Sequence, residues 1–181
     1  MPRYVALFRG INVGKAKRIA MADLRTLLEK LGYTDVKTLL NSGNAIFSGA
    51  AGATNKHAQR IRAAVARQLG VDARVIVKSA QDVAGIIADN KLEKLASDHS
   101  RLLVAVTDES SVLAALKPLA AKDWGREKVH VGKHGALIWC ANGILESQAL
   151  TAVLKGLEGG GTTRNWATLT KIHLLLKTDG S

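Results

Sequence analysis

The chain has 181 residues, 47% of them hydrophobic and 23% charged, which is the balance of an ordinary globular protein with one domain or two small ones. It contains one cysteine, Cys140, so an internal disulfide is excluded, and no stretch approaches the roughly 18 uncharged apolar residues of a membrane span. The net charge of +11 favours anionic partners, although a basic balance can also serve solubility alone. The first residues lack a signal-peptide layout, so we expect a cytoplasmic protein with no membrane partner.

The first 78 residues are predicted to form a βαββαβ unit. The predicted elements are a strand at 3–9, a helix at 21–32, strands at 36–41 and 44–48, a helix at 55–69 and a strand at 73–78. The first helix shows the i, i+3, i+4, i+7 spacing of an amphipathic helix in Leu24, Leu27, Leu28 and Leu31. This order of elements is that of the ferredoxin-like fold.

The rest of the chain repeats the same order after a linking helix and loop at 79–100. The predicted elements are a strand at 101–107, a helix at 108–120, a hairpin of strands at 128–132 and 136–140, a helix at 146–157, a glycine loop at 159–161 and a final helix at about 165–177. This second unit therefore lacks the last strand of the first. We predict an α+β fold of two ferredoxin-like βαββα(β) subdomains, 1–78 and 101–181, with antiparallel sheets and a C-terminal capping helix.

A glycine loop, GINVGK, follows the first strand and suggests an anion site. It is one residue shorter than a nucleotide-binding P-loop, and Ala16 replaces the hydroxyl that would bind Mg²⁺, so an ATPase is not expected. Arg9, Asn12, Lys15, Lys17 and Arg18 can still donate hydrogen bonds to an anion from a loop that glycines make adaptable. A solvated basic loop without a ligand is the alternative.

Two further segments carry polar side chains at predicted element ends. Ser42 and Asn44 lie in the turn NSGN, which hairpin geometry alone could explain or which could meet the glycine loop. Arg164 and Asn165 precede the predicted final helix, with Thr162 or Thr163 as its N-cap. Planar donors at a helix start suit a phosphate or carboxylate, so we expect Arg164 to be the main anion contact; a structural ion pair is the competing view.

The sequence does not predict a metal site, a cofactor or a catalytic residue. His130 and His134 are four residues apart, but they lie in a predicted hairpin and not on one helical face. Cys140 lies in an apolar strand and is expected to be a small core residue rather than a nucleophile.

The three motifs RGINVG, SGN and RNW together resemble those of the uncharacterised bacterial family called domain of unknown function 1697. The residues that match the family pattern are Tyr4 to Leu7, Arg9 to Gly14, Arg18, Ile19, Met21, Thr38, Ser42 to Asn44, Phe47, Arg164 to Trp166, Thr168 and Lys171. The chain departs from it at Lys15-Ala16-Lys17, where the family has a glycine followed by Lys-Asn. The resemblance implies two ferredoxin-like subdomains, an unknown function and, through its last motif, Lys171 as a further ligand-binding residue.

We therefore predict a binding protein for an anionic ligand, either nucleic acid or a phosphorylated metabolite, held in a cleft between the subdomains. The predicted site residues are Arg9, Asn12, Lys15, Ser42, Asn44, Arg164, Asn165 and Lys171. Two alternatives remain open: an enzyme acting on a small phosphorylated or carboxylated molecule, or a structural or regulatory protein-interaction module. The oligomeric state does not follow from the sequence.

Overall fold

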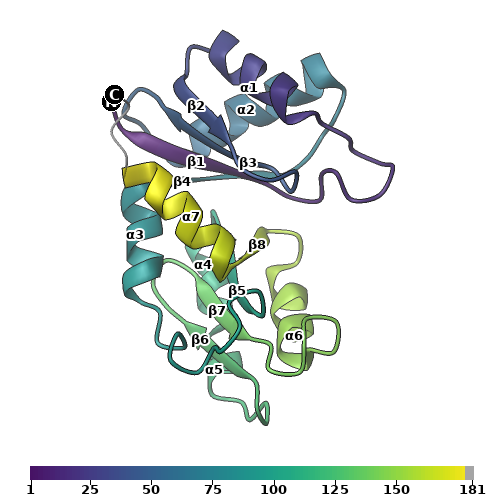
Figure 1. Ribbon diagram of the computed structural model, residues 1–181, viewed down its shortest axis with the longest axis vertical. Coiled ribbons are helices and arrows are strands. Elements are labelled where there is room, and N and C mark those ends of the chain that lie inside the picture. Colours follow the sequence, from purple (N-terminus) through teal and green to yellow (C-terminus); the bar gives the residue numbers. More distant parts are fainter. Residues whose placement is uncertain (178–181) are drawn as a thin grey trace. The chain divides into compact units, whose positions relative to one another are not determined.

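The computed structural model describes residues 1–177 and is an α+β protein of two compact units (Figure 1). Unit 1 comprises Met1–Gln81 together with the chain from Ile172 on, and unit 2 comprises Asp82–Lys171. Within the described residues, we find no helix with the length and apolar character needed to cross a bilayer.

Unit 1 is a four-stranded antiparallel sheet with two helices on one face (Figure 1). Its elements are β1 (Arg3–Phe8), α1 (Met21–Lys30), β2 (Thr34–Thr38), β3 (Asn44–Ser48), α2 (Thr54–Leu69) and β4 (Val75–Ser79). The strand order is β2-β3-β1-β4. Alternate residues of β1, Tyr4, Ala6 and Phe8, face the helices and pack with the buried leucines of α1 into one apolar core, as the period of two in a strand requires.

Unit 2 repeats this topology. Its elements are α3 (Ala80–Ala88), β5 (Leu102–Thr107), α4 (Ser110–Ala115), α5 (Lys117–Ala120), β6 (Lys128–Val131), β7 (Ala136–Trp139), α6 (Gln148–Leu157), β8 (Gly161–Asn165) and the first half of α7 (Trp166–Lys177). The strand order β6-β7-β5-β8 is the same as in unit 1, with all pairs antiparallel. The predicted α+β class with two ferredoxin-like subdomains is therefore confirmed, and Cys140 lies in the core of unit 2.

The prediction that unit 2 lacks its last strand is wrong. Residues 161–165, expected as a glycine loop and a helix start, form β8 and pair with β5, with Val104 opposite Arg164. The final helix begins one residue later, at Trp166, and its N-cap is Asn165 rather than Thr162 or Thr163, because Asn165 Oδ1 accepts the backbone N–H of Thr168 at 2.8 Å. Arg164 is therefore a strand residue and not a helix-start residue.

Two other predicted elements have different limits. The helix expected at 108–120 is two short helices, α4 and α5, that meet at Leu116. Pro118 lies in the first turn of α5, where its missing N–H leaves no helical hydrogen bond unmade. Strand β2 begins at Thr34 and ends at Thr38, so residues 39–43 form a longer connection than the tight turn expected there.

Candidate anion-binding site

The loop between β1 and α1 is closed by the side chain of Asn12. Its Nδ2 donates hydrogen bonds to the backbone oxygens of Ile19 (2.9 Å) and Asn41 (2.8 Å), and its Oδ1 accepts one from the Ile19 backbone N–H (2.8 Å). The Asn12 backbone N–H donates to the Lys17 oxygen at 3.0 Å. Ile11 and Ile19 are buried at the two ends of the loop. Packing and hydrogen bonds thus hold the loop at both ends.

The turn at 41–44 lies against this loop, so the structure brings the RGINVG and SGN motifs together within unit 1. Besides the bond from Asn12 to Asn41, the Phe8 backbone N–H donates to the Gly43 oxygen at 2.9 Å. Gly43 has a φ of +92°, and a Cβ at this position would lie 2.6 Å from Ile11 Cδ1. Only glycine fits both the backbone conformation and the close approach of the loop.

The predicted ligand residues of the turn are engaged within it. Asn44 is completely buried at the start of β3, and its Nδ2 donates to the Leu39 oxygen at 2.7 Å and to Ser42 Oγ at 3.2 Å. These bonds connect the two ends of the turn. Ser42 is exposed, so of the two it is the better placed to reach a ligand. Ligand binding by either residue stays a prediction.

The tip of the loop presents cations to solvent. Lys15, Lys17 and Arg18 are exposed, and Arg18 Nη1 donates to the backbone oxygens of Asn12 (3.1 Å) and Gly14 (3.3 Å). The Arg18 guanidinium therefore braces the loop from within. Two lysine ammonium groups on a braced loop can contact phosphate oxygens without the loop first having to be ordered.

The electrostatic environment of this tip is strongly positive. Residues 1–81 hold fourteen Lys and Arg against four Asp and Glu, a balance of +10, whereas residues 82–171 hold eleven against ten. The acid Asp72 is itself hydrogen-bonded by Arg62 at 2.7 Å, which holds the pKa of that carboxyl below its usual range, and Lys17 adds to the lowering. Nearly the whole excess charge of the chain thus belongs to unit 1.

The RNW motif lies in unit 2, where its arginine is buried, unlike the exposed cations of the loop in unit 1. Arg164 is only 9% exposed, and its Nη1 donates to Thr162 Oγ1 (3.0 Å) and to the Thr163 backbone oxygen (2.8 Å). Burial lowers the pKa of Arg164 to about 10, so its guanidinium is still charged at neutral pH. Asn165 caps α7, and Lys171 is exposed on that helix. A site shared by these residues and the loop of unit 1 stays a prediction.

Two exposed cations, Lys17 and Arg18, were considered from the sequence as possible donors of the loop but were not included among the predicted site residues. The available signal was the run of basic residues at the start of the chain, which has no acid before Asp23. The sequence could not show that Arg18 hydrogen-bonds the backbone of the loop, because these bonds depend on the loop conformation.

Replacing Asn12 with alanine is expected to loosen the loop locally. The Ile19 N–H would lose its acceptor, which costs about 1–2 kcal/mol, so amide exchange at Ile19 should become about tenfold faster. Asn41→Ala is the matched control, because Asn41 contributes only its backbone oxygen to the bond. Equal exchange rates in the two variants would contradict a closing role for the Asn12 side chain.

Comparisons with known proteins support the fold and the family. The family model described as "Protein of unknown function (DUF1697)" matches residues 1–136, which confirms the family and covers the RGINVG and SGN motifs, whereas the RNW motif at 164–166 lies outside the matched residues. Among solved structures, the conserved bacterial protein SP0830 from Streptococcus pneumoniae is similar, with a TM-score of 0.78 and 24% sequence identity over 97% of this chain and 99% of that one. A search of curated proteins gives no match. At this level of identity, the structural similarity concerns the fold alone.

Proposed function

We propose that this chain, which belongs to the DUF1697 family of proteins of unknown function, binds the phosphate backbone of nucleic acid through the loop at 9–20 of unit 1. The observation that carries the proposal is the set of exposed cations on a loop that Asn12 and Arg18 brace. The proposal assigns binding and no reaction. A cytoplasmic location belongs to it, since nucleic acid is available there.

The charge distribution supports a polyanion rather than a single small anion. The balance of +10 in residues 1–81 is spread over many exposed side chains, and a long anion can contact several of them at once. Each contact with a phosphate releases a condensed counterion, which adds affinity without reading the base sequence. We therefore expect binding that is strong at low salt and weakly selective for sequence.

The loop conformation supports a low entropic cost of binding. Gly10, Asn12, Gly14 and Lys17 all have positive φ, between 50° and 66°, and the hydrogen bonds of Asn12 hold this path in the free protein. A loop that is ordered before binding loses little conformational freedom when it meets its ligand. Lys15 and Lys17 then supply mobile charges on a fixed backbone.

Replacing Lys15 and Lys17 together with alanine is expected to weaken nucleic-acid binding about equally for all sequences. The slope of log affinity against log salt should fall by about 2, that is, by about 1 for each phosphate that a lysine no longer neutralises. The measurement is a gel shift of the full chain with single- and double-stranded nucleic acid between about 50 and 200 mM salt. Both side chains are exposed, so folding should not change.

The matched control is Lys91→Ala with Lys94→Ala, which removes the same charge from exposed positions of unit 2. This control should bind with nearly the slope of the unaltered protein. If the slope falls equally in both double variants, only net charge matters and the loop is not the site. If the unaltered protein gives no shift at the lower salt, the nucleic-acid proposal is rejected.

A further inference from the structure

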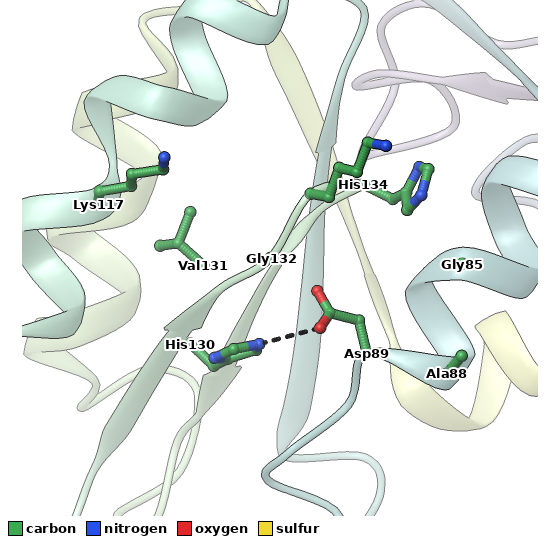
Figure 2. A pocket seen from close by; sticks show the side chains of 9 residues that line it. Gly85, Ala88, Asp89, Lys117, His130, Val131, Gly132 and His134 are labelled. Atoms are coloured by element: carbon green, nitrogen blue, oxygen red, sulfur yellow. Dashed lines mark ion pairs between the residues drawn. The ribbon is translucent and has the colours of Figure 1, made fainter.

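A second candidate site lies wholly in unit 2, in a hollow of about 560 Å³ between the end of α3, helix α5 and the β6–β7 hairpin (Figure 2). This volume falls within the range of about 300–1,000 Å³ that is usual for small-molecule sites. Figure 2 shows the side chains of Lys117, His130 and Asp89 around the same space. Lys133 and His134, from the turn of the hairpin, complete its polar lining.

The hollow depends on a glycine in the hairpin. A Cβ at Gly132 would overlap the Asp89 carboxylate, so the absence of a side chain there lets Asp89 lie directly against the hairpin backbone. At the other end of α3, His134 Nδ1 lies 3.8 Å from Asp82 Oδ1. Two His–Asp pairs, one at each end of α3, therefore hold polar side chains beside the hollow.

His130 has an unsatisfied ring nitrogen at this position. Its Nε2 lies 3.7 Å from Asp89 Oδ1, which is too long for a hydrogen bond, and this nitrogen is shielded from solvent and has no hydrogen-bond partner. A buried polar atom without a partner is unusual. This nitrogen faces the Asp89 carboxylate, so His130 contributes to the polar character of the lining without contacting a ligand directly.

We propose that this hollow binds a small phosphorylated molecule that also carries hydroxyl groups. Lys117, on α5, and Lys133, in the turn of the hairpin, both line the hollow, and their positive charges attract a phosphate group. The Asp89 carboxylate accepts a hydrogen bond from a ligand hydroxyl, and the hollow is larger than one phosphate group requires.

The residues that line the hollow fit a metal ion less well than they fit an anion. Among the described residues, no group of three or more His, Cys, Asp or Glu side chains is arranged to hold one. Two lysines at the hollow would also repel a cation. The same lysines attract an anion, so the charge of the lining selects the ligand class.

The test is an amide NMR titration of the full chain with ribose 5-phosphate, and with inorganic phosphate and ribose as separate arms. Ribose 5-phosphate should shift the amides of Gly85, Gly132 and Lys133, and should bind at least about tenfold more tightly than either part alone. Lys117→Ala with Lys133→Ala should weaken this binding by at least about tenfold, because the hollow would then lose both lysines whose charge attracts the phosphate.

The matched control is Lys128→Ala, which removes an exposed lysine from the same hairpin outside the hollow and should change the affinity by less than about twofold. The NMR spectrum of each variant shows directly whether it is folded. Shifts confined to residues 9–20, an equally weakened affinity in Lys128→Ala, or inorganic phosphate binding as tightly as the ester would each overturn the proposal. None of these outcomes depends on the gel-shift result for unit 1.

Discussion

Gly43→Ala is expected to lower the free energy of unfolding of unit 1 by about 3 kcal/mol. At a φ of +92° an L-residue is strained, and the added Cβ would lie 2.6 Å from Ile11 Cδ1 and 2.8 Å from Phe8 Cβ. The Phe8 atom belongs to the base of a buried side chain on a central strand, so it cannot move away without disturbing β1. The backbone strain and the steric overlap would both weaken the contact between the turn at 41–44 and the glycine loop.

This stability change requires a probe of unit 1, because all three tryptophans, Trp124, Trp139 and Trp166, belong to unit 2. Amide exchange at Val5 and Ile46, which are paired in the centre of the sheet, reports on the opening of unit 1. The control is Gly14→Ala. Gly14 also has a positive φ, +66°, but a Cβ there meets nothing within 4 Å, so we expect a decrease of about 1 kcal/mol. Similar decreases in the two variants would show that the packing contact is unimportant.

Arg164→Ala is expected to lower the free energy of unfolding of unit 2 by about 3 kcal/mol. The substitution removes a buried side chain from the edge strand β8 and takes the donor away from Thr162 Oγ1 and the Thr163 oxygen. Tryptophan fluorescence during urea unfolding can follow the change in stability of unit 2, because all three tryptophans belong to this unit and Trp166 is buried two residues from Arg164.

The matched control for this prediction is Arg101→Ala. Arg101 is exposed beside the same sheet and forms a long ion pair of 3.7 Å with Asp98, so its removal should cost no more than about 0.5 kcal/mol. The sequence-based view of Arg164 as the main anion contact requires a different result. It expects nearly unchanged stability and weaker nucleic-acid binding, and that pair of results would restore Arg164 to the ligand site.

The apolar periodicity of the chain was sufficient to predict most of the fold. The leucines of α1 recur at helical spacing and are buried on one face, and the continuous apolar run of β1 is buried on both of its faces, with Tyr4 and Phe8 toward the helices. Short-range patterns of this kind work because each helix or strand must bury one face whatever its partner. They failed at β8, whose sequence GTTRN has no apolar alternation.

The candidate site was predicted only in part. Composition located the basic residues of unit 1, and the motifs marked Asn12 and the turn at 41–44. Sequence did not reveal that Asn12 hydrogen-bonds the turn, because that contact follows from the antiparallel pairing of β1 with β3, about forty residues apart in the chain. Nor did it reveal the hollow of unit 2, since Asp82 on α3 and Asp89 just after it approach His134 and His130 only in the folded chain.

The sequence by itself determined the α+β class, the repeat of the ferredoxin-like order, the family and the excess of positive charge. These properties follow from local patterns and from composition, which need no knowledge of distant contacts. Only the tertiary structure decided that residues 161–165 are a strand and that Arg164 is buried. The physical reason is that a strand of low intrinsic preference forms when a neighbouring strand, here β5, offers its backbone N–H and C=O groups for pairing.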